Sequence, residues 1–594
     1  MYILGISCYY HDAAAALLHD GVLVAAVEEE RLSRKKHDAG FPERAIDFCL
    51  RFAGIKGDDL DYVVFYEKPL IKLDRILTTA VATFPRSLRA FREAMASTFN
   101  QKLWIKAQLM RKLGVTGKKV LFVDHHLSHA ASSFLCSPFH KAAILTVDGV
   151  GEWTTATMGE AQADWDGKGS NAIRLNHEIR FPHSLGLLYS AFTSFLGFEV
   201  NEGEYKVMGM APYGRPRYLD KVYKVVSVAE DGSFHLNMDY FQYHYSSRHT
   251  FNDKFIELFG SRRDPASEFV TALTQDDITG REAEAERNQY YADVAASIQV
   301  ATEEIILKMV KHLHKSTGAR SLCLAGGVGL NSVANGRILR ETPFESLFIQ
   351  PAAGDSGGAV GAALYTWHVL LGKPRRWTME NAYLGQAYST GDIHAFLDGQ
   401  GIKYETYENE ERLLDRVVDD LLEGKVIGWF QGRFEWGPRA LGNRSILADP
   451  RRGDMKQIVN NKIKFREPFR PFAPVVLESH VDSYFEGLPD PRDCYPARYM
   501  LLVLPWKNGM GDALPAVNHL GTGRLQTVRK EWNPRYYALV ERFGQATGIP
   551  VLMNTSFNLR GEPIVSSPAN AWSTFNKSGL DTLVMENCLV RKEV

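Results

Sequence analysis

Two histidines, His125 and His129, lie four residues apart directly after the apolar segment KVLFV. If a helix begins there, this spacing places both imidazoles on one face, one turn apart, where they could share a metal ion. A site with two histidines usually needs carboxylates to complete it. Asp148 ends the next apolar run and Asp355 follows a later one, where α/β folds present ligands. The four residues predict a metal site, and packed core histidines are the alternative interpretation.

Two glycine-rich turns also follow apolar strands, DGVG at residues 148–151 and AGGVGLN at residues 325–331. Such turns expose backbone N–H groups and let a phosphate approach without a Cβ in the way. Neither turn is a Walker A or GxGxxG motif, so each alone also fits a tight structural turn. A strand–turn–strand theme at residues 2–28 is repeated at 142–158, which suggests paired subdomains of the actin, Hsp70 and sugar-kinase type. With this repeat, the two turns favour nucleotide binding.

Positive charge is concentrated in residues 433–470, which carry ten Lys or Arg and four Asp or Glu in a chain of net charge −1. Arginine binds phosphate or carboxylate oxygens with two parallel hydrogen bonds, and lysine adds a point charge. A strand over KIKFR would place Lys462, Lys464 and Arg466 on one face. A solvated edge strand is the alternative, but the glycines, prolines and aromatic residues of this window favour a shaped pocket for a small polyanion. No wider basic excess was found to suggest nucleic acid.

Short β-rich runs that alternate with helical stretches predict an α/β fold to position these residues. A long amphipathic helix is expected over residues 290–316. The chain of 594 residues allows more than one domain. The basic, proline-containing segment 372–385 predicts a boundary between a domain of residues 1–371 and a domain of residues 372–594.

The composition, 45% apolar and 23% charged, is ordinary for a soluble globular protein. No apolar run approaches the roughly 18 residues of a membrane span, and the N-terminus lacks the basic start of a secretory signal. The six cysteines are far apart without a CxxC motif, so free thiols in a reducing compartment are expected. These features predict a cytoplasmic protein with neither a nucleic acid nor a membrane as partner.

Ten segments, in family order over nearly the whole chain, resemble the NodU/CmcH O-carbamoyltransferases, which include antibiotic, nodulation-factor and toxin carbamoyltransferases. The segments are GISCYYHDAAAAL (5–17), EEERLSRKKHDAGFP (28–42), VDHHLSHAASSF (123–134), VDGVGEWTT (147–155), EGEYKVMGMAPYG (202–214), GGVGLNSVANG (326–336), PAAGDSGGAVGAAL (351–364), GRFEWGPRALGNRSILADPR (432–451), IKFREPFRPFAPVVL (463–477) and NTSFNLRGEPIV (554–565). The resemblance implies an N-terminal duplicated actin/Hsp70-like (ASKHA) α/β domain, similar to the subunit that makes threonylcarbamoyl-adenosine on tRNA. It also implies a C-terminal YrdC-like α/β domain.

The resemblance further implies an ATP-dependent reaction in two steps. The C-terminal domain makes carbamoyl-adenylate from carbamoyl phosphate and ATP, with release of pyrophosphate. The N-terminal domain, with Fe(II) or another divalent metal, then transfers the carbamoyl group to a hydroxyl of a small-molecule natural product. ATP would be used with Mg²⁺, and a homodimer is one assembly that fits.

Site residues follow from the same motif matches. His125, His129, Asp148 and Asp355 fall on the metal positions, and His11 and Lys36 fall near the acceptor-side catalytic site. The N-terminal nucleotide positions are Gly149, Gly151, Glu204, Lys206, Gly326, Gly327 and Asn331. The carbamoyl phosphate and ATP positions of the C-terminal domain are Arg433, Arg439, Lys464, Arg470, Arg524, Asn554, Ser556 and Asn558. The chain departs from the family at Ala14, often serine, and at HLGTGR (519–524), one residue shorter than the usual HxDGTxR.

Two other functions are compatible with parts of the sequence. A tRNA threonylcarbamoyl-type transferase would share the N-terminal chemistry, but the near-neutral charge weighs against a tRNA substrate. An ATP-gated binding protein or chaperone of the actin/Hsp70 class would leave the basic cluster of residues 433–470 unexplained.

Overall fold

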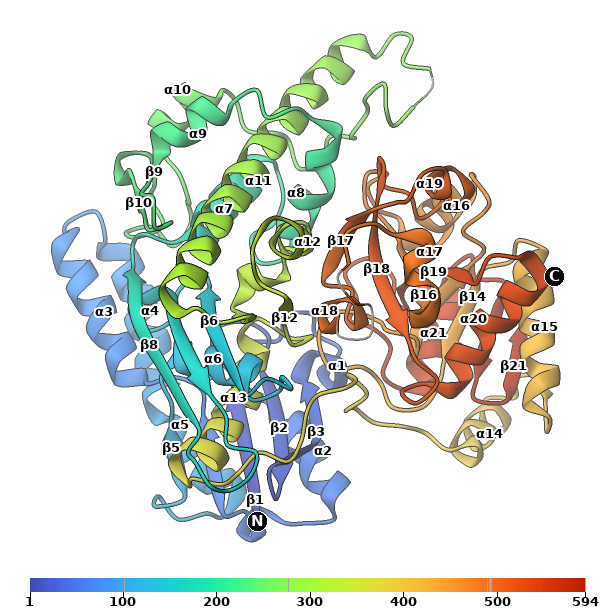
Figure 1. Cartoon of the computed structure of the whole chain (residues 1–594), viewed down its shortest axis with the longest axis horizontal. Coiled ribbons are helices and arrows are strands. Elements are labelled where there is room, and N and C mark those ends of the chain that lie inside the picture. The colour runs from blue at the N-terminus through green and yellow to red at the C-terminus, as the bar shows by residue number, and fades with distance from the viewer. Residues whose placement is uncertain (101, 276, 489, 491–493, 593–594) are drawn as a thin grey trace. The chain divides into compact units, whose positions relative to one another are not determined.

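The computed structural model describes residues 1–594 except 101, 276, 489, 491–493 and 593–594 (Figure 1). The chain forms two compact units. The first consists of Met1–Val24, Ala39–Pro42 and Cys49–Thr378, and the second of Ala25–Asp38, Glu43–Phe48 and Met379–Val594. The second unit therefore includes two segments from the N-terminal part of the chain, which a division at residue 372 does not anticipate.

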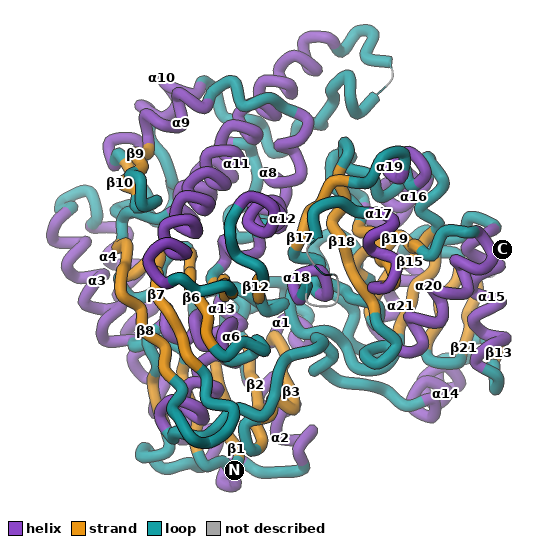
Figure 2. Tube along the Cα trace, viewed as in Figure 1, coloured by secondary structure: helices purple, strands orange, loops and turns teal. Residues whose placement is uncertain are grey.

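Two five-stranded sheets with matching connections belong to the first unit, except for residues 25–28 of the edge strand β3, which are part of the second unit (Figure 2). In the order β3-β2-β1-β4-β5, β1 pairs antiparallel with β2 and parallel with β4, and β4 pairs parallel with β5. In the order β12-β11-β6-β7-β8, β6 pairs antiparallel with β7 and parallel with β11, which pairs parallel with β12. The strands are β1 (Tyr2–Ser7), β2 (Ala14–His19), β3 (Val22–Glu28), β4 (Tyr62–Phe65), β5 (Val120–Phe122), β6 (Lys141–Val147), β7 (Thr154–Gln162), β8 (Ala172–Arg180), β11 (Ser321–Ala325) and β12 (Ser346–Phe348). The sheets are mixed α/β sheets, as expected.

Two central helices connect these sheets, and each packs against a different one. Helix α13 (Asp355–Tyr365) contacts β1, β2 and β4, whereas α6 (His125–Phe134) contacts β6 and β11, and the two helices contact each other. A Cβ at Gly361 of α13 would lie 1.8 Å from the Ser128 carbonyl oxygen of α6. Only glycine allows the two backbones to approach this closely.

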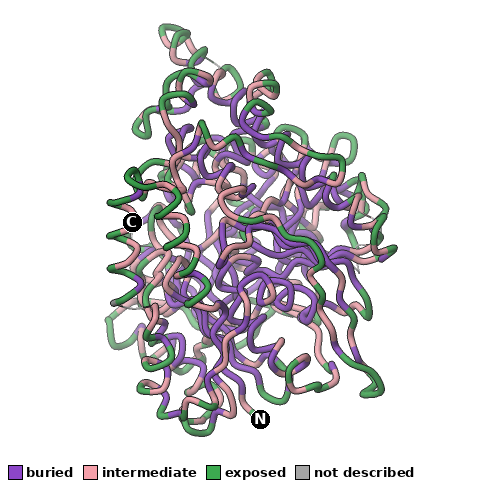
Figure 3. The backbone as a smooth tube through the Cα atoms, turned by 90° about the vertical axis from the view of Figure 1, so that its left-hand side faces the viewer, coloured by how far each residue is buried: buried purple, intermediate pink, exposed green. Residues whose placement is uncertain are grey.

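The remaining helices surround the two sheets, and Figure 3 shows the buried interior and the exposed outer segments. They include α3 (Pro69–Ala82), α4 (Leu88–Asn100), α5 (Ile105–Leu113), α7 (Leu185–Phe195), α8 (Glu204–Met210), α9 (Leu219–Val225), α10 (Asp253–Phe259), α11 (Glu282–Thr317) and α12 (Ser332–Glu341). Helix α11 confirms the long helix predicted at residues 290–316. The helix begins earlier than predicted. The prediction missed its first turns because they are polar and carry little apolar periodicity.

The second unit is built on a nine-stranded sheet in its described residues, in the order β13-β21-β20-β14-β15-β19-β16-β18-β17. The strands are β13 (Glu405–Thr406), β14 (Ile427–Phe430), β15 (Arg444–Ala448), β16 (Ala473–Leu477), β17 (Leu502–Pro505), β18 (Thr522–Val528), β19 (Val551–Ser556), β20 (Thr582–Met585) and β21 (Cys588–Arg591). Apolar residues of α15 (Glu410–Leu422) and α20 (Pro534–Thr547) form one core with β14, β16 and β19. Helices α14 (Thr390–Gly399) and α21 (Pro568–Lys577) contact β21 and β20, respectively.

The strand expected over residues 462–466 was wrong. Helix α16 (Met455–Val459) continues into a π-helical turn, Asn460–Lys464, so Lys462 is exposed whereas Lys464 is buried. The buried residues Met455, Val459 and Ile463 are four apart, which is a helical period. This apolar spacing outweighed the alternation of basic residues that suggested a strand.

All six cysteines are buried free thiols, as predicted. Among the described residues, no helix combines the length and the apolar content needed to cross a membrane.

Candidate metal centre and anion site

The four predicted metal ligands meet in the first unit, and all are buried. The Nε2 atoms of His125 and His129 lie 3.0 Å apart, and Asp148 Oδ2 lies 3.3 Å from His125 Nε2. Asp355 Oδ1 lies 3.6 Å from both Nε2 atoms. Ligand atoms about 2.1 Å from a tetrahedral ion would be about 3.4 Å apart. The spacing of these atoms therefore suits one ion.

The residues present fit a divalent metal by a second criterion. Asp355 Oδ1 is buried and has no hydrogen-bond partner among the described residues. A buried carboxylate oxygen is costly to leave unpaired, and a metal ion at the centre of the group would satisfy it. Two imidazoles with two carboxylates suit Fe(II), Mn or Zn rather than Mg²⁺ or Ca²⁺, which prefer all-oxygen sites.

The fold brings these ligands together from distant parts of the chain. His125 is the first residue of α6, and His129 follows one turn later. Asp148 directly follows β6, and Asp355 is the first residue of α13. Because α6 and α13 pack closely through Gly361, Asp355 reaches the histidines of the other helix.

Residues around the ligands hold them in place. The Gly327 N–H donates to Asp148 Oδ1 at 2.8 Å, and the Tyr66 hydroxyl donates to Asp355 Oδ2 at 3.2 Å. The His125 N–H donates to Glu152 Oε1 at 3.1 Å. A Cβ at Gly151 would lie 2.8 Å from the His125 ring, so the turn after β6 closes over this histidine. These contacts orient three of the four ligands, as outer-shell partners of metal sites do.

Glu67 and Lys72 form a buried ion pair beside the ligands. Lys72 Nζ lies 2.6 Å from Glu67 Oε2, which in turn lies 3.9 Å from His125 Nδ1. The Lys72 ammonium also lies 5.1 Å from the centre of the Tyr10 ring. Sequence reasoning missed Tyr66 and Glu67. Their position at the carboxyl end of β4 is the signal that could have indicated them.

The charges of the site shift the pKa values of its members. Burial opposes protonation of His125, but Asp355 and Asp148 outweigh burial and raise the pKa of His125 to about 9. Burial likewise opposes the charge of Asp148, but its contact with His125 and the charge of His129 lower the pKa of Asp148. Without a metal ion, His125 thus holds a proton more readily, because the carboxylates of Asp148 and Asp355 favour a positive charge beside them.

His126, between the two ligands in sequence, is not one of them. Its Nδ1 lies 2.6 Å from Thr146 Oγ1, and its Nε2 lies 2.8 Å from the Thr154 carbonyl oxygen. A carbonyl can only accept, so Nε2 carries the hydrogen and Nδ1 accepts from the threonine. Burial, together with the charges of His125 and His129, lowers the pKa of His126 to about 3. His126 is therefore a neutral core histidine.

His11 lies in the first unit and feels the charge of the metal site. Its Nδ1 lies 3.0 Å from Asp12 Oδ2, and its ring lies 4.7 Å from that of Tyr10. Burial opposes protonation, but Asp355, Asp12 and Asp148 raise the pKa of His11 to about 9. Lys36, which the sequence groups with His11, belongs to the second unit, where its charge contributes to lowering the pKa of Lys464.

The two glycine turns follow β6 and β11, which are parallel neighbours, so they meet at one edge of the sheet. Gly149 and Gly151 lie in the first turn, and Gly326 and Gly327 lie in the second. Gly326 has φ +91°, and a Cβ there would lie 2.2 Å from the Val147 carbonyl oxygen. Glycine is required at this position by both conformation and space.

Three other predicted nucleotide residues have structural contacts of their own. Asn331 caps α12 by accepting from the Ala334 N–H at 3.2 Å. Glu204 Oε1 accepts from the Ser190 hydroxyl at 2.8 Å. Lys206 lies over the Phe198 ring, 5.6 Å from its centre.

In the second unit, Lys464 is a buried ammonium surrounded by neutral acceptors. Its Nζ donates to Asn558 Oδ1 at 2.8 Å, to the Asn558 carbonyl at 3.0 Å and to Ser556 Oγ at 3.3 Å. Burial, and then the charges of Arg466, Arg470 and Lys36, lower its pKa. Among the described residues, Lys464 has no carboxylate within ion-pair distance. A buried cation of this kind can receive an anion from solution.

The other predicted residues of the second unit differ in how they are held. Arg433 Nε donates to the Gly385 carbonyl at 2.8 Å, so this arginine has a structural contact. Asn554 is buried and donates to Gln526 Oε1 at 2.6 Å and to the Ala440 carbonyl at 3.1 Å. It therefore anchors the segment that carries Arg439.

Arg439 is half-buried next to Ala440, and Arg470 lies 3.6 Å from Glu467 in an ion pair. Arg524 lies on β18, opposite Val503 of β17.

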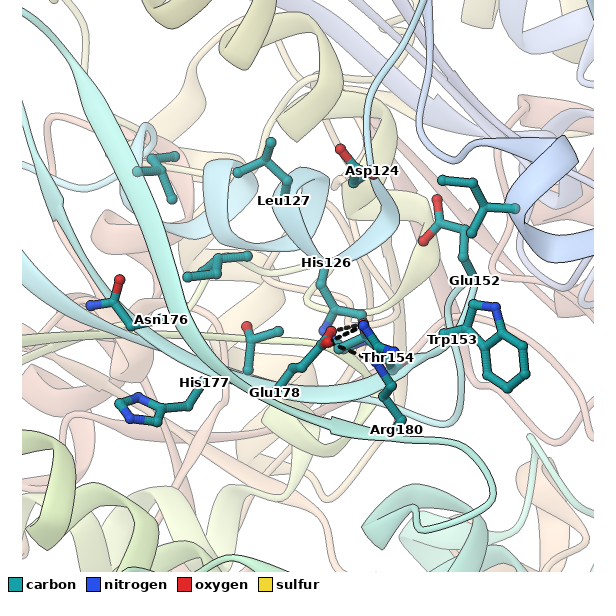
Figure 4. Close-up of a pocket in the computed structure, with 14 residues that line it drawn as sticks. Asp124, His126, Leu127, Glu152, Trp153, Thr154, Asn176, His177, Glu178 and Arg180 are labelled. Atoms are coloured by element: carbon teal, nitrogen blue, oxygen red, sulfur yellow. Dashed lines mark hydrogen bonds and ion pairs between the residues drawn. The ribbon is translucent and has the colours of Figure 1, made fainter. Parts of the chain in front are cut away.

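A cavity of about 510 Å³ lies beside the N-terminus of α6 (Figure 4). His126 lines this cavity, whereas the four metal ligands do not. Glu178 of β8 accepts from the Thr154 hydroxyl and from Arg180 Nε, each at 2.7 Å. Glu152 lines the cavity and also contacts the backbone of His125. The sequence had not indicated this cavity.

Comparison with known proteins identifies the class. Residues 2–364 match the carbamoyltransferase N-terminus family and residues 418–592 match the carbamoyltransferase C-terminus family. The chain therefore belongs to the carbamoyltransferase family and is a transferase enzyme, which confirms the resemblance found in the sequence.

The chain is also similar to individual proteins. The chain is 36% identical to nodulation protein NolNO of Sinorhizobium fredii over 98% of this chain and 79% of that protein. It is 46% identical to an uncharacterized protein of Synechocystis sp. over 100% of this chain and 97% of that protein. Among solved structures, HypF of T. kodakarensis is similar with a TM-score of 0.32 and 14% identity, covering 62% of this chain and 48% of that one.

Proposed function

We propose that this carbamoyltransferase is an ATP-dependent O-carbamoyltransferase that modifies a hydroxyl of a small-molecule acceptor. Carbamoyl phosphate and ATP react in the C-terminal domain, residues 372–594, to give carbamoyl-adenylate and pyrophosphate. Because the adenylate keeps a single phosphorus atom, water must first cleave the P–O bond of carbamoyl phosphate to give carbamate and inorganic phosphate. The carbamate oxygen then attacks the α-phosphorus of ATP and displaces pyrophosphate. The carbamoyl group then passes to the acceptor oxygen in the N-terminal domain, residues 1–371, and AMP is released.

One observation carries the proposal. A single carbamoyltransferase chain contains a buried His, His, Asp, Asp group in one unit and, in the other, the buried ammonium of Lys464. The first arrangement suits a cation, and the second suits an anion. A reaction that uses a phosphorylated carbamoyl donor and a nucleotide needs both kinds of site.

In the C-terminal domain, carbamoyl phosphate offers phosphate oxygens and little apolar surface. Its binding must come mainly from charge-assisted hydrogen bonds. Lys464 supplies one donor, positioned by Ser556 and Asn558. Arg439, Arg470 and Arg524 supply the others in the proposed site, and an anion that reaches Lys464 would keep its ammonium protonated.

In the N-terminal domain, His125, His129, Asp148 and Asp355 would hold Fe(II) or another divalent ion. When bound, such an ion supplies a Lewis acid that neutralises charge on a phosphate oxygen. The turns that carry Gly149, Gly151, Gly326 and Gly327 would let the nucleotide approach without a Cβ in the way, and Glu204, Lys206 and Asn331 complete its proposed surroundings. This domain would have the actin/Hsp70-like fold and the other the YrdC-like fold.

Transfer requires that the acceptor hydroxyl lose its proton as its oxygen attacks the carbamoyl carbon. His11 is of the right type for this base, and Asp12 holds its ring through Nδ1.

The experiment that tests the proposal separates the two steps. The whole chain, loaded with Fe(II), is incubated with ATP, Mg²⁺ and carbamoyl phosphate, and isotope exchange between pyrophosphate and ATP is measured. Hydroxylated natural products are then added singly, and products are analysed by mass spectrometry for one added carbamoyl group. We expect exchange that depends on carbamoyl phosphate and an acceptor-dependent release of AMP. Carbamoyl transfer without ATP consumption would overturn the mechanism.

A further inference from the structure

Exposed apolar side chains are concentrated in one short part of the first unit. Eight of the seventeen large hydrophobic residues that are exposed in the described chain lie between residues 70 and 104. They are Leu70, Ile71, Leu77, Val81, Phe84, Leu88, Phe99 and Trp104. Val81 is 80% exposed, Leu70 73%, Phe84 69% and Trp104 58%. Such a concentration on a water-soluble surface indicates an interaction site.

Six of these residues lie on helices α3 and α4, which lie against each other (Figure 1), whereas Phe84 lies in the connection between the two helices and Trp104 in the short turn after α4. Leu70, Leu77 and Val81 are seven and four residues apart, so they share one face of α3. Leu88 and Phe99 are eleven residues apart and share one face of α4 in the same way. The apolar residues therefore form stripes along the two helices.

The same part of the chain is strongly basic. Residues 68–119 contain twelve Lys or Arg and only two Asp or Glu, a net charge of +10 in a chain whose total is −1. Six of the cations are exposed, namely Arg86, Arg89, Arg92, Lys106, Arg111 and Lys118. This basic excess exceeds that of residues 433–470, so the expectation that no basic excess lies outside residues 433–470 was wrong.

We propose that these eight apolar and six cationic residues, which lie on α3, α4, α5 and the segments next to these helices, form an α3–α5 surface that docks the enzyme on an anionic lipid bilayer. Apolar side chains enter the boundary between headgroups and acyl chains, while Lys and Arg contact the headgroups. No spanning helix is needed for binding of this kind. The expectation of no membrane partner rested on the lack of a spanning helix. That lack does not argue against binding at the membrane surface.

Two other occupants fit the surface less well. A second copy of the chain would bring a strongly positive segment against an identical one, and like charges oppose that contact. Nucleic acid would satisfy the cations, but phosphates offer no partner to Leu70, Val81 or Phe84. Only a bilayer with anionic headgroups matches both the charge and the apolar stripes.

The test is co-sedimentation of the full chain with vesicles of phosphatidylcholine alone or mixed with phosphatidylglycerol, at low and high salt. We expect at least tenfold stronger binding to the anionic vesicles, and weaker binding at high salt. Val81→Asp with Phe84→Asp tests the apolar stripe, and Arg92→Glu with Lys106→Glu and Arg111→Glu tests the charge. Each set should reduce binding at least tenfold.

Matched controls lie elsewhere in the same unit. Lys308, Lys311 and Lys315 are exposed on α11, so reversing them to Glu changes the net charge equally, and Leu273→Asp removes an apolar residue that is 58% exposed. These controls should bind as the unmodified chain does. Circular dichroism and metal content show that each variant is folded.

Four results would overturn the proposal. The first is no binding to anionic vesicles at low salt, and the second is equal loss of binding in the α11 control. The third is binding of a labelled RNA duplex that the charge variant loses and the apolar variant keeps, which would assign the surface to nucleic acid. A dimer dissociated by the apolar variant, measured by light scattering, would assign it to a second copy instead.

Discussion

The Nε2 atoms of His125 and His129 face each other at 3.0 Å inside the first unit. Both side chains are completely buried. Asp148 and Asp355 lie 3.3 and 3.6 Å from His125. The two histidines and two aspartates therefore direct lone pairs toward a common centre instead of pairing hydrogen-bond donors with acceptors. Such an arrangement binds a cation.

Replacing a ligand should separate the two half-reactions. His125→Ala or Asp148→Asn should lose the bound metal, and carbamoyl transfer should fall at least a hundredfold, because the remaining ligands cannot complete the coordination shell. Pyrophosphate release should persist, since it is assigned to the other domain. Metal content by elemental analysis and the two assays check this. His126→Ala should keep its metal, and full transfer by metal-free His125→Ala protein would contradict the assignment.

Removing the buried ammonium should abolish adenylate formation. Lys464→Met keeps the length of the side chain but removes its charge, and Arg439→Ala removes a second proposed donor. Charge-assisted hydrogen bonds contribute roughly 1.5–3 kcal/mol each, so the affinity for carbamoyl phosphate should fall about ten- to a hundredfold. Exchange between pyrophosphate and ATP at subsaturating carbamoyl phosphate measures this, while the metal stays bound.

The control for that experiment is Lys462→Ala, because Lys462 is exposed two residues away in the same helical turn. It should show exchange like that of the unmodified enzyme. Unchanged exchange in Lys464→Met would contradict the assignment of Lys464 to the carbamoyl phosphate site.

The contact between α6 and α13 should tolerate no side chain at its closest point. In Gly361→Ala the new Cβ would lie 1.8 Å from the Ser128 carbonyl oxygen, so one helix must move. Overpacking of this kind costs about 1–3 kcal/mol of unfolding free energy, and metal affinity should fall as Asp355 is displaced. Gly354→Ala is the matched control, because its Cβ would meet nothing within 4 Å. Thermal melts and metal titration distinguish them, and equal behaviour of both variants would refute the packing argument.

The pKa of His11 should depend on the metal. Burial opposes its protonation, but Asp355, Asp12 and Asp148 raise its pKa to about 9 in the metal-free protein. A divalent cation neutralises Asp355 and Asp148, so the pKa should fall by at least a unit and leave a neutral base near pH 7. Nuclear magnetic resonance titration of labelled histidine with and without Zn²⁺ measures this. A metal-free pKa near 6.5 would contradict it.

The same shift predicts how His11 affects stability. Its pKa in the folded, metal-free state exceeds that of the unfolded chain, so its stabilising contribution is complete below about pH 6.5 and is lost as pH rises through about 9. His11→Gln should therefore destabilise the metal-free protein more at pH 6 than at pH 10. Denaturant unfolding at the two pH values checks this, and an equal effect at both would show that the ring contributes only through packing.

Local patterns in the sequence were enough to predict several features. The alternation of β-rich runs and helices indicated mixed α/β sheets, and apolar periodicity located most of α11. The HxxxH spacing places His125 and His129 on one helix face, because four residues make about one turn. These features depend on residues close in sequence, which is where periodicity carries information.

Tertiary structure decided which distant residues meet. Asp355 joins His125 only because Gly361 lets two central helices touch, and Tyr66 and Glu67 join them from the end of another strand. Residues 25–38 belong to the second unit although they lie near the start of the chain. The alternating Lys462, Lys464 and Arg466 suggested a strand, yet burial of Met455, Val459 and Ile463 formed a helix and placed Lys464 alone inside. Packing between distant segments set these outcomes, because the free energy of burial depends on neighbours that no local pattern contains.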